Sequence, residues 1–249
     1  AGIPFEVVPG ISSAIAVPAY AGIPVTERGM ASSFAVVTGH EDPKKNESAI
    51  DWEKLATGTD TLVFVMGVRN LPDITARLIA CGRSADTPAA IIRWGTRSDQ
   101  TTIVTTLGSA AYEAARQGIT PPAIFLVGDV VRCRSSLRWF DKRPLFGLTV
   151  GITRTRSQAS ALSARLEELG ASCIEIPTIR LEDPSDHYAA LDQAIYYLTS
   201  YDWLLFTSVN GVHRFFHRLG EFKEDSRALG GLRLGVIGSA TAEALRSYG

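Results

Sequence analysis

The chain has 249 residues, of which 45% are hydrophobic and 20% charged, a composition typical of a folded globular protein. Its formal net charge of −1 argues against nucleic-acid and membrane-surface partners, because phosphate-rich surfaces are normally bound by a basic face. No apolar run reaches the roughly 18 residues that a membrane-spanning helix needs. The three cysteines are far apart and form no CxxC pair, so we expect small apolar side chains, a cytoplasmic location and no metal site.

Residues 1–140 alternate short β-rich runs with helical patterns. The patterns predict strands at 5–8, 33–38, 61–66, 89–94 and 123–127, and helices at 12–20, 71–80 and 112–117. The run at 61–66 is almost wholly apolar, which is typical of a strand buried on both faces. The polar stretch Asp141–Pro144 then breaks the pattern and is the expected linker.

Residues 147–249 follow a stricter β-α-β rhythm. The patterns predict strands at 148–153, 173–176, 203–207 and 232–237, and helices at 157–169, 188–198, 212–219 and 241–248. Apolar strands separated by helices imply parallel pairing with right-handed crossovers, and such sheets bind ligands at the carboxyl ends of their strands. Because the chain starts abruptly and stops just past a helical pattern, we expect it to be part of a longer protein.

Candidate binding residues of the first region lie at strand ends and turns. Ser12 and Ser13 open a helix after a Pro-Gly turn, where amides and hydroxyls suit an anion, although N-capping by a serine is the simpler interpretation. Met66 ends the buried strand, where a thioether packs on a ligand or simply on the core. Gly95 and Ala123 lie in turns whose small residues let a ligand approach the backbone, a property that ordinary turns share.

Two turns of the second region, Thr207–Gly211 and Gly238–Ala242, each follow a strand and open a helix. Their amides, with the hydroxyls of residues such as Ser208 and Thr241, form candidate carboxylate cradles. Helix capping explains each turn equally well when it is taken alone. The occurrence of two such turns in one region favours a cleft for a polyanion.

The histidines give weaker signals. His213 and His217 have the i, i+4 spacing of a metal pair on a helix, but no Cys or carboxylate stands at ligand spacing, so a partly exposed helix face is the better interpretation. His40 follows a strand and is expected in a loop hydrogen bond. The sequence contains no GxGxxG motif, phosphate-loop lysine, HExxH or GxSxG.

Several motifs of residues 1–146 together resemble the uroporphyrinogen-III C-methyltransferase family. They are VPGISSA at 8–14, AYAGIP at 19–24, VTGH at 37–40, DW at 51–52, TLVFVMG at 61–67, WGT at 94–96 and VGDVV at 127–131. The resemblance implies the C-terminal part of a tetrapyrrole methylase, an α/β domain with a mixed sheet and helices, normally a homodimer. Such enzymes use S-adenosyl-L-methionine to methylate uroporphyrinogen III at C2 and C7, which gives precorrin-2 for sirohaem or cobalamin.

The same resemblance assigns residues. It places cofactor contacts at Ser12, Ser13, Met66, Gly95 and Ala123. The family's Gly-rich first domain, with its proton-transfer residues, has no counterpart in this chain, so the catalytic residues stay unassigned. Glu27 also stands where the family usually has His.

Residues 147–249 are similar to the N-terminal part of uroporphyrinogen-III synthase. The matching motifs are ITR at 152–154, QA at 158–159, LGA at 169–171, PTI at 177–179, YDW at 201–203, FTSVNGV at 206–212 and GSATA at 238–242. The resemblance implies part of a two-lobed parallel α/β enzyme that closes hydroxymethylbilane into uroporphyrinogen III without a cofactor. It places Ser208 and Thr241 in the substrate cleft.

The two resemblances support each other, because the synthase makes the substrate of the methyltransferase. We therefore expect a fused enzyme of tetrapyrrole biosynthesis with small-molecule partners, and we expect this chain alone to be inactive. A methylase acting later in cobalamin synthesis is one alternative. A non-catalytic α/β anion-binding module is the other.

Overall fold

A computed structural model describes residues 3–39, 49–153 and 156–249 of the chain. These residues form two compact units, Ala1–Ile179 and Arg180–Gly249, and each is described by itself. His40 and Arg154 lie outside the described residues. No helix of the described part is long and apolar enough to cross a membrane.

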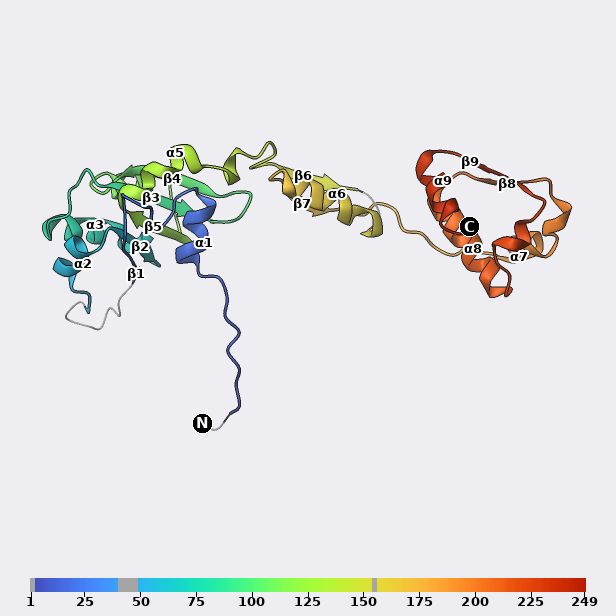
Figure 1. The fold of residues 1–249 in the computed structure, drawn as a ribbon, viewed down its shortest axis with the longest axis horizontal. Coiled ribbons are helices and arrows are strands. Elements are labelled where there is room, and N and C mark those ends of the chain that lie inside the picture. Colours follow the sequence, from blue (N-terminus) through green and yellow to red (C-terminus); the bar gives the residue numbers. More distant parts are fainter. Residues whose placement is uncertain (1–2, 40–48, 154–155) are drawn as a thin grey trace. The chain divides into compact units, whose positions relative to one another are not determined.

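The first unit is built on a five-stranded mixed sheet (Figure 1). Its strands, in spatial order, are β1 (Phe34–Thr38), β2 (Thr61–Val65), β5 (Ala123–Val127), β3 (Pro88–Arg93) and β4 (Thr101–Thr106). β1 and β2 run parallel, and the other neighbours run antiparallel. The mixed α/β fold predicted from the sequence is confirmed.

Helices cover both faces of this sheet because the central strands are apolar on both sides. One face packs Leu62, Phe64 and Phe125 against α2 (Trp52–Gly58), α3 (Leu71–Ala80) and α4 (Ala110–Arg116). The other face packs residues such as Val63, Ile92 and Leu126 against α1 (Ser13–Tyr20) and the short helix η2 (Asp129–Cys133). Successive residues of a strand point to opposite faces, so one apolar run serves both layers.

The stretch expected to be a polar linker is instead packed into the first unit. It follows α5 (Arg134–Leu137) and overlaps η3 (Phe140–Lys142). Asp141 forms an ion pair of 2.6 Å with Arg134, and the two side chains are only 8% and 10% exposed. The Trp139 indole N–H donates to the carbonyl oxygen of Ala19 at the end of α1. The charged Asp141 side chain can be buried here because the Arg134 guanidinium neutralises it.

The end of the first unit is a parallel pair, β6 (Thr149–Ile152) and β7 (Ser172–Glu175), joined by α6 (Arg156–Glu168). The linker contacts α6, since the Arg143 guanidinium donates to the carbonyl oxygen of Glu167. A Cβ on Gly170 would lie 2.8 Å from the Arg143 Cβ, so glycine permits this approach. The compact units divide at 179/180, and the family boundary predicted at 146/147 stays a prediction.

The second unit contains another parallel pair, β8 (Trp203–Phe206) and β9 (Arg233–Val236). Its helices are α7 (Ala189–Tyr196), α8 (Val209–Glu221) and α9 (Ser239–Arg246), with the short helices η4 (Leu198–Ser200) and η5 (Ser226–Leu229). An apolar stripe of α8, formed by Val212, Phe215, Phe216 and Leu219, packs on Phe206 and closes a small core. The predicted alternation of strands and helices is confirmed, with boundary shifts of a few residues.

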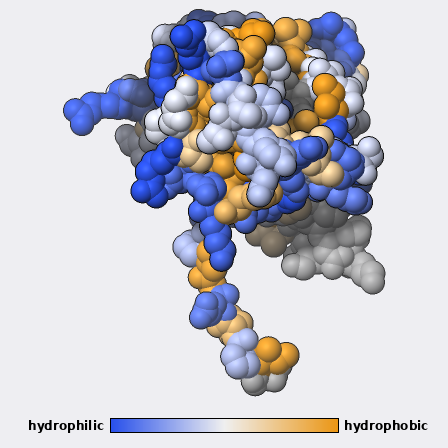
Figure 2. Space-filling view, turned by 90° about the vertical axis from the view of Figure 1, so that its right-hand side faces the viewer, coloured by the Kyte–Doolittle hydropathy of each residue, from blue (hydrophilic) through white to orange (hydrophobic). Residues whose placement is uncertain are grey.

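The prediction of a strand at residues 5–8 is wrong. This segment is part of no helix or strand, and the side chains of Phe5 and Val8 are 84% and 87% exposed. The segment extends away from α1 in Figure 1, and apolar residues are visible on its surface in Figure 2. An apolar run becomes a strand only where a neighbouring strand pairs with its backbone, and none of the described strands does so.

Candidate functional site

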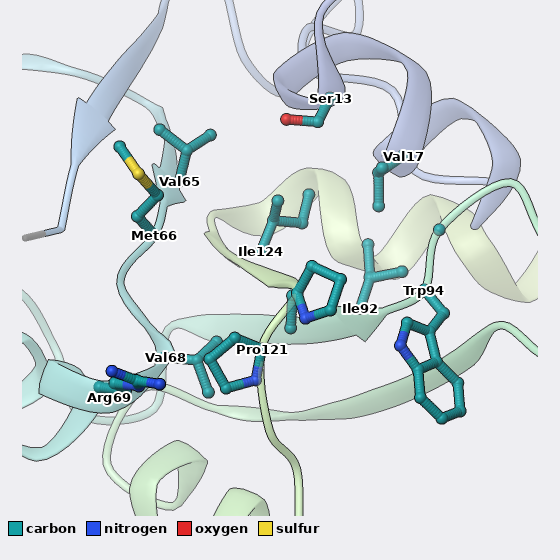
Figure 3. Close-up of a pocket in the computed structure, with 13 residues that line it drawn as sticks. Ser13, Val17, Val65, Met66, Val68, Arg69, Ile92, Trp94, Pro121 and Ile124 are labelled. Carbon is teal, nitrogen blue, oxygen red and sulfur yellow. The ribbon is translucent and has the colours of Figure 1, made fainter.

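A cavity of about 420 Å³ opens at one end of the mixed sheet, where the central strands meet α1 (Figure 3). Its lining residues are Ser13, Val17, Val65, Met66, Val68, Arg69, Ile92, Trp94, Gly95, Pro121, Pro122, Ala123 and Ile124. Four of the five residues predicted to contact a cofactor, Ser13, Met66, Gly95 and Ala123, are therefore brought to one cavity.

Sheet topology explains why residues distant in sequence meet here. Met66 follows the last residue of β2, and Gly95 comes two residues after the end of β3. β5 runs antiparallel between these two strands, so its first residue, Ala123, lies at the same end and pairs with Arg93. Met66 and Ala123, both expected to contact the cofactor, therefore line the same cavity although they are distant in sequence.

Helix α1 supplies the remaining predicted residues. The Ser12 side chain accepts a hydrogen bond of 3.3 Å from the amide of Ala14, so Ser12 is the N-cap of α1. Ser12 is not among the cavity-lining residues, whereas Ser13, the first residue of the helix, is. The simpler interpretation thus describes Ser12 in this structure, and cofactor contact by Ser12 stays a prediction.

The backbone around the cavity is strained. Met66, Trp94 and Thr96 have φ values of 56°, 50° and 72°, in the left-handed region that residues other than glycine rarely adopt. Two of these three residues line the cavity and the third adjoins Gly95. Such strain costs about 1–3 kcal/mol per residue and clusters at functional sites, so its concentration here marks the cavity as the candidate site.

Gly95 has a packing role that the sequence did not reveal. A Cβ built on Gly95 would lie 2.4 Å from both methyl carbons of Val17 on α1. The missing side chain therefore lets the turn after β3 contact the helix directly. Gly39 and Gly67 show a similar approach, because a Cβ on Gly39 would lie 2.3 Å from the Gly67 Cα.

The cavity walls are apolar with a few polar groups. Proline, valine, isoleucine and alanine side chains dominate, and the Met66 thioether lies on one side (Figure 3). The polar side-chain groups are the Ser13 hydroxyl, the Trp94 indole N–H and the Arg69 guanidinium. The Trp94 ring is held by the Arg93 guanidinium, whose Cζ lies 3.7 Å from the ring centroid. This combination is typical of a small-molecule site, and Arg69 is a lining residue that sequence reasoning missed.

The two turns of the second unit lie at the same end of neighbouring strands. Ser208 follows β8 and caps α8, accepting a hydrogen bond of 3.1 Å from the amide of Gly211. Thr241 lies in the first turn of α9, after β9, and is 5% exposed. Parallel pairing of β8 and β9 places both turns at the carboxyl edge, where the sequence predicted them.

The two helical histidines contact separate neighbours. The Nδ1 atom of His213 lies 2.9 Å from the Tyr248 hydroxyl, and the Nδ1 atom of His217 lies 3.7 Å from a carboxylate oxygen of Glu221. Within residues 3–39, 49–153 and 156–249, no three His, Cys, Asp or Glu side chains are grouped so as to hold a metal ion.

Two family models match the chain. Residues 1–111 match the tetrapyrrole (corrin/porphyrin) methylases, and residues 160–249 match uroporphyrinogen-III synthase HemD. The chain is therefore similar to the tetrapyrrole methylases over its first part and to uroporphyrinogen-III synthase over its last part.

Proteins from several organisms are similar in sequence to this chain. The porphyrin biosynthesis protein HemD of Ruminiclostridium josui is 38% identical over 247 residues, which are 99% of this chain and 49% of that protein. A uroporphyrinogen-III C-methyltransferase of Bacillus subtilis is 39% identical over 228 residues, 92% of this chain and 46% of the relative. The chain thus spans about half the length of these curated relatives.

Shorter matches cover the first half of the chain. The S-adenosyl-L-methionine-dependent uroporphyrinogen III methyltransferase of Methanosarcina barkeri is 52% identical over 135 residues, 54% of this chain and 53% of that protein. Among solved structures, the uroporphyrin-III C-methyltransferase of Thermus thermophilus complexed with S-adenosyl homocysteine is 31% identical, with a TM-score of 0.45 over 53% of each chain.

Proposed function

We propose that the protein containing this chain methylates uroporphyrinogen III at C2 and C7 with S-adenosyl-L-methionine, giving precorrin-2. We propose further that its synthase segment takes part in forming uroporphyrinogen III from hydroxymethylbilane. The observation that carries the first proposal is the cavity that collects Ser13, Met66, Gly95 and Ala123. The two family matches and the names of the relatives support both proposals.

We also propose a division of the chain into two segments. Residues 1–146 are assigned to the C-terminal part of the methylase and residues 147–249 to the N-terminal part of the synthase. The pair β6–β7 would then belong to one synthase lobe and the pair β8–β9 to the other, which agrees with the division of the compact units at 179/180. The methylase part is assigned a homodimer.

The residues of the cavity suit the cofactor. A volume of about 420 Å³ falls within the range of small-molecule sites, and the apolar walls suit an adenosine group. The Met66 thioether is polarisable and packs well on an aromatic ring. When bound, the cofactor supplies the methyl group. The chain's own residues would hold and orient it, with the Ser13 hydroxyl available as a hydrogen-bond donor or acceptor.

Filling the cavity tests this assignment. In the whole protein, we expect Ala123→Phe to weaken binding of S-adenosylhomocysteine by ~10-fold or more, a loss of about 1.4 kcal/mol, because the ring occupies ligand volume. Isothermal titration calorimetry measures the change. Ala115→Phe, on the exposed side of α4, is the matched control and should leave binding unchanged. Equal binding by wild type and Ala123→Phe would contradict the cofactor site.

The methylation itself is tested with the whole protein, S-adenosyl-L-methionine and uroporphyrinogen III. We expect chromatography to resolve a dimethylated product. If no methylated product forms, the methyltransferase proposal is wrong.

The synthase segment is expected to bind its ligand through many amides and hydroxyls. Charge-assisted bonds of this kind contribute roughly 1.5–3 kcal/mol each, so losing one hydroxyl should reduce the rate without abolishing it. In the whole protein, we predict that Ser208→Ala or Thr241→Ala lowers the rate of cyclisation by ~10-fold. The measurement is uroporphyrinogen III formation from hydroxymethylbilane.

One control separates binding from folding in that experiment. Because Ser208 caps α8, its loss also costs about 1 kcal/mol of helix stability, so Ser208→Thr, which keeps a capping hydroxyl, should retain most activity. A fall to the spontaneous background in either alanine variant would mean that the residue performs proton chemistry.

A further inference from the structure

One charged side chain that lines the cavity, Arg69, is not among the proposed cofactor contacts. Arg69 lies in η1 (Val68–Asn70), which follows β2 directly, and it is the only cation among the thirteen lining residues. In Figure 3, Arg69 lies at the lower left of the view and Ser13 at the top. The cavity therefore has a cationic side chain at one edge.

Several other arginines of the first unit have acidic partners, but no described acidic side chain pairs with Arg69. Arg77 pairs with Asp73, Arg97 with Asp99 and Arg116 with Glu113. Within the described part of the chain, the Arg69 guanidinium makes neither an ion pair nor a hydrogen bond. None of the described residues that line the cavity is acidic.

The backbone holds Arg69 in place at this edge. The Asn70 side-chain amide donates a hydrogen bond of 2.8 Å to the carbonyl oxygen of Gly39, which ties the turn after β2 to the end of β1. α3 begins at Leu71 without a side-chain cap, so the positive end of its dipole lies within two residues of Arg69. The hydrogen bond fixes the turn, and the helix dipole favours an anion near the guanidinium.

We propose that Arg69 binds a carboxylate of a ligand at the edge of this cavity. The planar guanidinium matches a carboxylate with two parallel hydrogen bonds. The Arg69 side chain is exposed, so this contact would lie at the rim of the cavity. The inference rests on the proposed function, whose two ligands both offer this group. One source is the methionine carboxylate of the cofactor, and the other is a carboxylate side chain of the tetrapyrrole.

Equilibrium binding to the whole protein tests the proposal. The probes are S-adenosylhomocysteine and uroporphyrin III, a stable octacarboxylate, each titrated separately against wild type, Arg69→Gln and Arg69→Lys. We expect Arg69→Gln to raise the dissociation constant of one probe by ~10-fold. Arg69→Lys should raise it less, because lysine keeps the positive charge but cannot make two parallel hydrogen bonds to a carboxylate. The weakened probe identifies the source of the carboxylate.

The control is Arg132→Gln, which removes an exposed guanidinium paired with Asp129 outside the cavity lining. It should leave both dissociation constants within twofold. Added salt should weaken binding to wild type more than to Arg69→Gln, because only wild type makes the charged contact. If Arg69→Gln binds both probes as wild type does, the proposal is wrong.

Methylation assays on the same proteins keep the two proposals separate. A wild type that forms methylated product while Arg69→Gln binds both probes normally would refute only the role of Arg69. A wild type that forms none, while Arg69→Gln still weakens one probe, would refute only the proposed methyltransferase activity.

Discussion

We expect Asp141→Ala to lower the free energy of unfolding of the first unit by about 3–5 kcal/mol, the usual effect of removing one partner of a buried ion pair. The substitution leaves the Arg134 guanidinium, only 10% exposed, without its carboxylate. The same guanidinium donates to the carbonyl oxygen of Ala21, just past α1. Loss of the pair should therefore loosen the contact between the linker and the helix that lines the cavity.

The measurement is urea unfolding followed by tryptophan fluorescence. Trp203 is the only tryptophan of the second unit, so a Trp203→Phe background leaves Trp52, Trp94 and Trp139 to report on the first unit alone. Asp129→Ala is the matched control. The side chains of Asp129 and its partner Arg132 are both exposed, so their ion pair should contribute at most about 1 kcal/mol to the free energy of unfolding. Equal effects of the two substitutions would show that the Arg134–Asp141 pair does not stabilise the unit.

The same pair predicts a pH dependence. Burial raises the pKa of the Asp141 carboxyl, but hydrogen bonds from Arg138 and Arg134 outweigh it, and the pKa lies below its ordinary value. A carboxyl with a lowered pKa in the folded state stabilises that state at pH values above the unfolded pKa, about 3.9. The stability difference between wild type and Asp141→Ala should be constant above about pH 5 and shrink as the pH falls below about 4. A difference that persists undiminished at pH 2 would contradict the ionic origin of the effect.

The central strands could be predicted because their signal is local. β2, β3 and β5 are apolar on both faces, and a continuous run of buried residues needs no knowledge of its partners. β4 was missed because its sequence, TTIVTT, contains four threonines and no apolar run, although β-branched residues favour strands. The prediction for residues 5–8 shows the converse error. Their composition suits a strand, but no described strand pairs with them.

The site was predicted by a different route. Ser13, Met66, Gly95 and Ala123 were found by resemblance, because each taken alone has an ordinary explanation as a cap, a core residue or a turn. Arg69 gave no signal, since a basic residue after a strand is most often a solvated one. Burial of Asp141 was equally invisible, because it depends on where Arg134 lies in space.

The contact between Gly95 and Val17 gives the second large prediction. We expect Gly95→Ala to destabilise the first unit by about 1–3 kcal/mol, the range for overpacking, because its Cβ would lie 2.4 Å from two methyl carbons of Val17. Relief requires α1 to move away from the sheet, and Ser13 moves with it. Since a displacement of about 1 Å can cost up to 100-fold in function, we expect S-adenosylhomocysteine binding by the whole protein to fall by ~10–100-fold.

A double-mutant cycle tests the stated cause. Val17→Ala alone should destabilise by about 1–2 kcal/mol through lost packing. It removes both methyl carbons but leaves the Val17 Cβ at 2.8 Å, so the double variant should recover part of the binding lost in Gly95→Ala. The two effects should be non-additive by about 1 kcal/mol. Gly58→Ala, where a Cβ meets nothing within 4 Å, is the matched control and should be close to neutral. Strictly additive effects would mean that the close approach of Gly95 to Val17 is not the cause of the loss.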